Sequence, residues 1–428
     1  LQKKQQQKLV QKKLQQKKQP QKLQQKKQQQ NLDVVKSRVK NMNKKFYFLF
    51  FLFLILVSLS FSQKKLNEAI YKEINGRERL TLDFSTIERP KTHEEFKSVF
   101  HLPPVRQDTT GTCWCFSSTS FFESELKRLG KEPVKLSEMF TVYHEYLDKC
   151  RRFIQEKGNS LVSEGSQNNA VVIQYKKVGA VRASDYNGLL NGSTSHDHRE
   201  LVKEIESYLD YIKKNNYWDE EKALQYIKLI LNKHLGKPPE TINVDGKNIT
   251  PKEYMEKYLQ LPLDDYVLFM STKSIPFYTK GEYKVPDNWW HCKEYHNVPL
   301  DEFYNAIKNA IINGYSLTLA GDVSEPGLNS NEDIAIIPTF DVLPENINQD
   351  SREFRFSNRT TTDDHGIHLV GYKKIGKDDW FLIKDSGGTG WRGEEKGYIF
   401  YRGDYIKLKM LAFMVHKDAV KDLLKKFK

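Results

Sequence analysis

The feature that most constrains this chain is the segment QDTTGTCWCFS at residues 107–117, where a glutamine stands six positions before a cysteine that opens an apolar, helix-competent run. A cysteine attacks as its thiolate, and the unpaired N–H groups at a helix N-terminus favour that negative charge. Gln107 can place its amide beside the sulfur, where it would donate to the oxyanion formed when a carbonyl is attacked. The segment therefore predicts a nucleophilic Cys113 at the start of a helix.

A thiolate nucleophile needs a base, and the base needs a group that orients it. His365 opens an apolar, strand-like run, and a second such run at residues 380–384 leads into Asp385 and a glycine-rich turn. Two adjacent strands can bring His365 and Asp385 side by side. We therefore predict that His365 keeps Cys113 as the thiolate and later protonates the leaving amine, while Asp385 orients the imidazole.

Taken together, these segments resemble the papain-like cysteine peptidases. The matching stretches are residues 107 and 111–117, residues 365–372, and residues 384–391, and Leu136-Ser137-Glu138 stands where that fold begins its next helix. The resemblance implies a two-lobed α+β fold, with a helical lobe, an antiparallel β lobe and a helical insertion. It also implies peptide-bond hydrolysis, peptides as partners, no metal or organic cofactor, and substrate-backbone binding at Gly165 and Ser166.

Two features suggest the bleomycin hydrolase and aminopeptidase C branch. Thr110 stands where papain has a disulfide cysteine, and Cys113 and His365 are 252 residues apart (365 minus 113), against about 130 to 150 in papain-like enzymes. We place the extra residues in an insertion at about 196–262, where apolar residues recur at three- and four-residue steps. Resemblance to this branch implies trimming from peptide N-termini and allows a homo-oligomer.

The sequence departs from the family pattern at two positions. Asp385 stands where asparagine is usual, and Gly387 replaces a tryptophan that shields the histidine contact. A carboxylate stabilises an imidazolium more strongly than an amide does, whereas the missing indole predicts that water reaches this contact. Two alternatives to an aminopeptidase therefore stay open, namely a papain-like endopeptidase and a catalytically silent homologue that binds peptides.

The basic charge of the chain lies in its first residues. The formal net charge is +13; residues 1–41 carry +12, and Lys44 with Lys45 add two, so the remainder carries 13 − 12 − 2 = −1. A nucleic-acid function for the folded part therefore loses its main support. Residues 1–41 are a Gln/Lys low-complexity extension, which we expect to be untranslated or disordered.

Residues 42–62 have the organisation of a signal peptide. They begin with Met42 and two lysines, continue with a 12-residue apolar core at 46–57, and end with small residues at Ser60 and Ser62. We expect cleavage near Gln63, only transient membrane contact, and an exported mature chain, periplasmic or secreted. The alternative is a retained signal anchor, but the core is shorter than the roughly 18 apolar residues typical of a spanning segment.

The rest of the chain divides into a lead-in at 63–100, with helical character around residues 66–74, and a peptidase domain at 101–428. In that domain, residues 266–420 read as strands interrupted by a helix at 300–313. The three other cysteines read as core thiols, with no disulfide required. His368 follows His365 by three positions, so strand alternation sends the two side chains to opposite faces, and we predict no metal site there.

Overall fold

A computed structural model of the chain describes residues 31–32, 34, 36, 69–74, 76–190, 192–324 and 327–427. The chain divides into two compact units, Leu1–Glu68 and Ala69–Lys428. In the first unit the described residues are helical; the predicted signal peptide at 42–62 lies outside the described residues, as does most of the Gln/Lys extension. No described helix is both long enough and apolar enough to cross a membrane.

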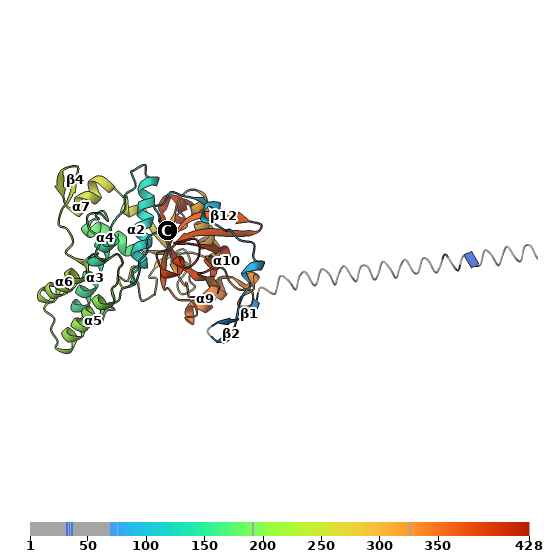
Figure 1. The fold of residues 1–428 in the computed structure, drawn as a ribbon, viewed down its shortest axis with the longest axis horizontal. Coiled ribbons are helices and arrows are strands. Elements are labelled where there is room, and N and C mark those ends of the chain that lie inside the picture. Colours follow the sequence, from blue (N-terminus) through green and yellow to red (C-terminus); the bar gives the residue numbers. More distant parts are fainter. Residues whose placement is uncertain are drawn as a thin grey trace, which may run out of the picture. The chain divides into compact units, whose positions relative to one another are not determined.

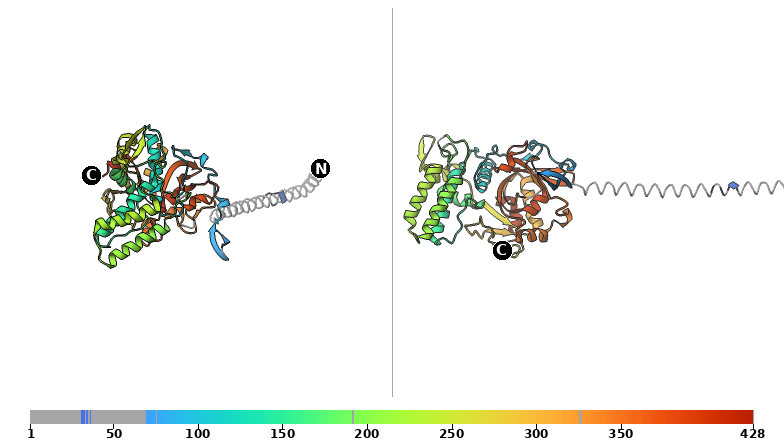
Figure 2. Two further views of the ribbon diagram at one scale, coloured as in Figure 1. Left: turned by 60° about the vertical axis from the view of Figure 1, so that its left-hand side comes forward. Right: turned by 60° about the horizontal axis from the view of Figure 1, so that its bottom comes forward.

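The second unit consists of a helical lobe and a lobe built on one large sheet. Figure 1 shows the helices α3 to α7 gathered on one side and the strands of the later chain on the other, with α2 running between them, and Figure 2 shows the same separation. The sequence prediction of a two-lobed α+β fold is confirmed.

Several helices of the first lobe start at a side-chain cap. The Ser137 hydroxyl accepts from the N–H of Phe140 at 3.0 Å, and the Asp219 carboxylate accepts from that of Lys222 at 3.2 Å. The helices are α2 (Cys113–Arg128), α3 (Glu138–Gln155), α4 (Asn169–Val178), α5 (Arg199–Lys214), α6 (Glu220–Leu235) and the short α7 (Pro251–Glu253), continued by the π-helical segment Tyr254–Leu259.

The second lobe is a sheet in which most neighbours are antiparallel. Its order is β10-β11-β14-β13-β12-β9-β15-β6-β8-β7, with β3 on β12 and with parallel pairing in β11–β14 and β6–β8. The strands are β3 (Lys97–Ser98), β6 (Tyr266–Met270), β7 (Lys280–Gly281), β8 (Tyr295–Asn297), β9 (Leu317–Gly321), β10 (Leu328–Asn329), β11 (Ile334–Ala335), β12 (His365–Ile375), β13 (Asp378–Lys384), β14 (Tyr398–Arg402) and β15 (Met410–His416).

Further helices accompany the sheet, and α8 packs on β12 and β9. These helices are α8 (Leu300–Ile312), α9 (Gln349–Ser357), α10 (Gly403–Lys409) and α11 (Lys421–Leu424), with 3-10 turns at Phe84–Thr86, His93–Glu95, Leu263–Asp265, Pro344–Asn346, Gly388–Trp391 and Lys417–Val420. The sequence predicted α8 but not α9 or α10, which lie in stretches read as strand and loop.

Helix α2 lies between the two lobes and is therefore buried on nearly every side. Its residues from Trp114 to Leu126 are buried, and it packs on β12 of the sheet as well as on α3 and α4. Phe121 lies edge-on to Tyr266 of β6 and to His368 of β12. The first residue of this helix is therefore held where the two lobes meet.

The prediction of helical character around residues 66–74 is wrong over residues 69–74, the part of this stretch that the structure describes. Residues 69–82 form an antiparallel hairpin of β1 (Ala69–Ile74) and β2 (Arg77–Leu82), in which Ile74 pairs with Arg77. Between the strands the sequence reads Asn75-Gly76, the dipeptide most typical of two-residue hairpin loops, and Gly76 has a positive φ of 72°.

The insertion is less purely helical than predicted. Helices α5 and α6 lie at the two amphipathic stretches, but β4 (Ile242–Val244) and β5 (Lys247–Ile249) follow as a small hairpin. Its loop is Asp245-Gly246, and both residues have φ near +50° or above. Aspartate followed by glycine favours this left-handed turn, so the signal was present in the sequence.

Candidate active site

The sulfur of Cys113 lies at the first residue of α2, against the start of β12. The thiol is free and only partly buried, and the backbone N–H of Gly366 donates to Sγ at 3.4 Å. Gly366 must be small, because an added Cβ would lie 3.1 Å from the Trp114 Cα. The nucleophile predicted from sequence is thus placed in direct contact with the predicted histidine strand.

His365 connects the sulfur to Asp385. Its Nε2 donates to the Asp385 Oδ1 at 2.7 Å, which leaves Nδ1 as the ring nitrogen available to Cys113. Burial by itself lowers the pKa of His365, but the charges and hydrogen bonds of Asp385 and Cys113 raise it well above its ordinary value. The geometry therefore favours an imidazolium between a carboxylate and a sulfur.

Asp385 is fixed by three donors. Besides His365, the Gly387 N–H donates to Oδ1 at 2.8 Å and the Thr389 hydroxyl donates to Oδ2 at 3.0 Å. Burial raises the pKa of Asp385, but these partners, with His365 first, bring it below its ordinary value. The pairing of β13 with β12 places Asp385 beside His365. The three donors keep its carboxylate ionised and directed at the ring.

The prediction that water reaches the His365–Asp385 contact is wrong. The Asp385 side chain is fully buried, and that of His365 is 9% exposed. The backbone of Gly387 lies against the His365 ring. The approach is so close that a Cβ added to this glycine would lie 2.8 Å from the His365 Cε1. The backbone of residue 387 occupies the space beside the ring, so no indole is needed as a shield.

Gln107 is held beside the Asp385 loop. The Ser386 hydroxyl donates to its Oε1 at 2.8 Å, and its Nε2 donates to the carbonyl of Thr110 at 2.6 Å. The Gln107 N–H also donates to the Ser386 carbonyl at 3.0 Å. An amide nitrogen carries two hydrogens, so one N–H of the fixed Gln107 side chain is still available to an oxyanion.

The sequence did not predict a role for Glu164, which binds the loop at residues 107–112 that precedes Cys113 (the nucleophile loop). Its Oε2 accepts from the Gly111 N–H at 2.7 Å, and its carbonyl accepts from the Trp114 Nε1 at 3.1 Å. His198, just before α5, lies 3.5 Å from the same carboxylate. The only sequence signal for this role was that Glu164 directly precedes Gly165.

The structure places Gly165 and Ser166 beside the nucleophile loop, because the preceding residue, Glu164, binds Gly111. It does not test substrate binding. The Ser166 hydroxyl is buried and donates to Glu145 at 2.8 Å, so its side chain is engaged in packing. The Asp287 carboxylate lies against Gly165, where an added Cβ would be 2.4 Å from either carboxylate oxygen. Their role in binding the substrate backbone stays a prediction.

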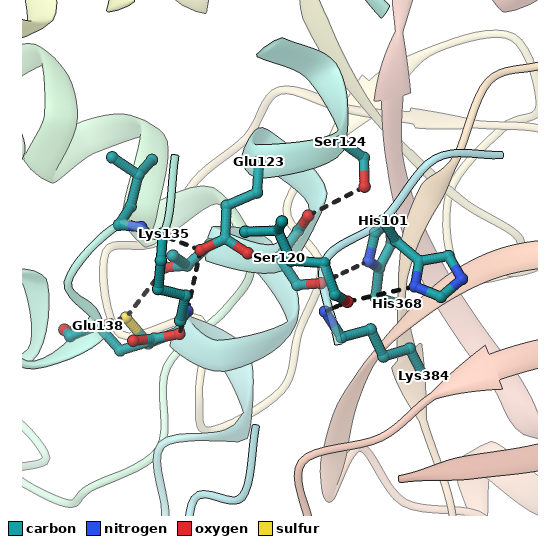
Figure 3. A network of polar contacts seen from close by, with 12 residues as sticks. His101, Ser120, Glu123, Ser124, Lys135, Glu138, His368 and Lys384 are labelled. Atoms are coloured by element: carbon teal, nitrogen blue, oxygen red, sulfur yellow. Dashed lines mark hydrogen bonds and ion pairs between the residues drawn. The ribbon is translucent and has the colours of Figure 1, made fainter. Parts of the chain in front are cut away.

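Behind α2, a buried polar network links the lobes (Figure 3). Lys135 pairs with Glu123 at 2.9 Å and with Glu138, Ser120 contacts the His368 Nδ1 at 2.8 Å, and Lys384 donates to the carbonyl of Leu102 at 2.6 Å. His368 thus faces α2 within the core, away from His365 and Asp385. Burial lowers its pKa well below the ordinary value.

The other thiols are poor nucleophiles. Burial raises the pKa of Cys115 well above its usual value and that of Cys150 to about 12, and it also raises the pKa of Cys292. All four cysteines are free. Among the described residues, the one group with metal-ligand spacing is His93, Glu94 and Glu395, where His93 already bonds to Glu395 and stacks on Tyr398.

Comparison with known proteins identifies relatives over part of the chain. It is 24% identical over 262 residues to aminopeptidase C of Listeria innocua and 25% identical over 260 residues to aminopeptidase C of Streptococcus thermophilus; each match covers 51% of this chain and 58% of the relative. The chain thus spans little more than half the length of the curated relatives it matches. No profile of a known protein family matches.

The fold comparison agrees with the sequence comparison. PepW from Lactobacillus rhamnosis HN001 superposes with a TM-score of 0.60 and 17% identity, covering 78% of this chain and 86% of PepW. This similarity establishes a papain-like fold. The predicted relationship to the bleomycin hydrolase and aminopeptidase C branch is confirmed by the aminopeptidase C relatives together with this fold.

Proposed function

We propose that this relative of aminopeptidase C, built on the papain-like fold, is a cysteine peptidase that removes residues from peptide N-termini. The observation that carries the proposal is the contact series from Cys113 through His365 to Asp385. A cysteine, a histidine with a raised pKa and a buried carboxylate in this order form an activated nucleophile.

The reaction follows from this arrangement. The Cys113 sulfur attacks the carbonyl carbon of the peptide bond, and the oxyanion receives a hydrogen bond from the free N–H of Gln107 and one from the Cys113 backbone. The His365 imidazolium then gives its proton to the leaving amine, and a thioester remains on Cys113. The now neutral imidazole takes a proton from water, whose oxygen attacks the thioester and releases the acid.

A pair of matched peptides tests the activity. Hydrolysis of a peptide amide with a free N-terminus supports a peptidase. Cys113→Ala should abolish this hydrolysis. The control variant Cys115→Ala should fold and still hydrolyse the peptide through Cys113. Equal or faster cleavage of the N-acetylated peptide would favour the endopeptidase alternative. A protein that reacts with a thiol-directed electrophile at Cys113 but cleaves neither peptide would be a silent homologue.

We propose further that the peptidase acts outside the cytoplasm. Support comes from the basic start, the apolar core and the small residues at 42–62. The N-terminal sequence of protein recovered from the producing cells should begin near Gln63. Recovery of a chain that retains residues 46–57 would contradict cleavage and favour the retained anchor.

We also propose self-association through the insertion. Tyr211 of α5 and Tyr226 with Leu229 of α6 are exposed, and Tyr208 connects the two tyrosines by ring contacts. Exposed aromatic clusters of this kind mark protein interaction surfaces. Light scattering should report more than one chain per particle, and Tyr226→Lys with Leu229→Lys should return it to one.

A further inference from the structure

The nucleophile loop carries both the glutamine that donates to the oxyanion and the residues that lead into the nucleophile. The Gln107 amide donates to the Thr110 carbonyl at 2.6 Å, and the Thr110 hydroxyl donates to the Gln107 carbonyl at 2.9 Å. Gly111 and Thr112 follow, and Cys113 opens α2. A displacement of residues 110 and 111 would therefore move the Gln107 amide relative to the Cys113 N–H.

One residue from outside this loop binds the chain on both sides of Cys113. The Gly111 N–H donates to the Glu164 carboxylate at 2.7 Å, and the Trp114 indole N–H donates to the Glu164 main-chain carbonyl at 3.1 Å. Glu164 thus fixes the loop before the sulfur with its side chain and the first turn of α2 with its backbone.

The Glu164 carboxylate is held in turn by groups of the helical lobe. The Tyr146 hydroxyl donates to it at 3.4 Å, and Nδ1 of the buried His198 lies 3.5 Å from it. Burial raises the pKa of Glu164, but His198 and the bonded N–H and O–H groups bring it below its ordinary value. An ionised carboxylate is a stronger acceptor than a neutral group, so the bond to the loop is a strong one.

The segment that supplies His198 also pairs with the nucleophile loop through its backbone. The His198 N–H donates to the Thr109 carbonyl at 3.1 Å, and the Thr109 N–H donates to the His196 carbonyl at 3.1 Å. This segment leads directly into α5 (Arg199–Lys214). The start of the insertion therefore holds Glu164 and the loop in one arrangement.

We infer that Glu164 is a positioning residue for the two oxyanion donors, an inference that rests on the proposed function. An oxyanion donor stabilises the transition state only when it is held at the place where the negative charge develops. The Gln107 amide belongs to the loop and the Cys113 N–H to α2, so their separation depends on what fixes the loop to the helix. Glu164 does not touch the reacting atoms and acts through Gly111 and Thr110.

Glu164→Ala tests this role, because it removes the carboxylate and keeps the carbonyl that binds Trp114. Acylation and deacylation both form an oxyanion, so kcat for Ala-Ala coumarylamide should fall at least about 10-fold while KM stays within about threefold. Glu164→Gln should restore most of kcat, because its amide oxygen still accepts from Gly111. Glu200→Ala, a matched change at a glutamate that is 72% exposed, should change neither constant.

Alkylation separates positioning from a general loss of structure. Iodoacetamide reacts at its CH₂ carbon, where the sulfur displaces iodide and no oxyanion forms. The rate of Cys113 alkylation in Glu164→Ala should therefore stay within about threefold of the wild-type rate. An unchanged kcat or a rise in KM alone would overturn the inference. An alkylation rate that falls as far as kcat would also overturn it, because Glu164 would then support the thiolate or the fold.

A binding experiment separates the positioning role from the activity. The Cys113 sulfur adds to the carbonyl carbon of Ala-Ala-aldehyde, and the carbonyl oxygen takes the electron pair and then a proton from His365. Protection of Cys113 from iodoacetamide measures this binding, which should be at least about 10-fold weaker in Glu164→Ala. If the wild-type enzyme cleaves nothing but this difference is found, the proposed function fails and the positioning role stands. Equal protection of the two proteins overturns the positioning role whatever the activity.

Discussion

Residue 385 shows what a single side chain contributes to this site. The fully buried Asp385 carboxylate raises the pKa of His365, so the imidazolium beside Cys113 survives to higher pH. The sequence predicted that His365 and Asp385 lie side by side, because one opens an apolar strand and the other follows one, and the structure brings the two side chains together. The sequence could not predict the position of Gly387, because only the folded backbone brings this glycine against the His365 ring.

Asp385→Asn should move the alkaline limb of the pH–rate profile downward by about 1 to 3 units. An amide holds the imidazolium less strongly, so the ring loses its proton at lower pH. The hydroxyl of Thr389 can turn to accept from the new amide, which keeps the geometry and much of the rate at the optimum. An unmoved alkaline limb in kcat/KM would show that Asp385 does not act on His365.

Gly387→Ala should lower kcat/KM about 100-fold, because displacing a catalytic ring by about 1 Å can cost that much. The new methyl would lie 2.8 Å from the His365 Cε1 and 3.0 Å from Nε2. Gly388→Ala is the matched control, since nothing lies within 4 Å of a Cβ there. Steady-state kinetics of the two variants should differ; similar values would contradict the close approach of residue 387.

At the scale of elements, the polar network behind α2 ties that helix to α3. Lys135 lies between Glu123 of α2 and Glu138 of α3, and these charges raise its pKa despite the opposing effect of burial. Glu123 in turn accepts from the N–H of Leu136 at 3.0 Å. The start of α3 is thus fixed to the helix that carries the nucleophile.

Lys135→Met should reduce the free energy of unfolding by about 3 kcal/mol, because it leaves two buried carboxylates without a cation. The estimate is at the low end, since the lysine is 32% exposed. Urea denaturation should show this loss, whereas Lys237→Met at an exposed ion pair should change stability by at most about 0.5 kcal/mol. Equal stability of the two variants would exclude a structural role for Lys135.

The elements that the sequence predicted well are those with long apolar periodicity or a cap. Helix α3 begins after Ser137 and α8 runs from Leu300 to Ile312, as the residue pattern indicates. The β1–β2 and β4–β5 hairpins were not predicted, because their strands are short and polar. The information lay in the Asn-Gly and Asp-Gly loops rather than in hydrophobic alternation.

At the scale of the molecule, the fold brings together side chains from segments far apart in the chain. The nucleophile was predictable from a local motif, whereas Asp287 becomes a neighbour of Gly165 only in the folded chain. Tertiary burial, which no local pattern encodes, also separates Cys113 from the fully buried Cys115 and Cys150.

Native protein treated with limiting iodoacetamide should therefore be alkylated first at Cys113. Cys115 and Cys150 are fully buried, and burial raises their pKa values, so they should react only after unfolding. Peptide mapping by mass spectrometry should find Cys113 modified in the native protein, whereas an excess of reagent in urea should modify all four cysteines. Faster modification of Cys150 or Cys292 in the native state, with loss of activity in step, would overturn the assignment of the nucleophile.

The burial of Cys115 has a further consequence for oxidative damage. An exposed thiolate oxidises first to a sulfenic acid, which a neighbouring thiol can rescue by forming a disulfide. Cys115 cannot serve as that thiol, because its Sγ lies inside the helical lobe and donates to the Glu138 carbonyl at 3.3 Å. Recovery of an oxidised Cys113 through a disulfide therefore needs a thiol other than Cys115, such as a small thiol from solution.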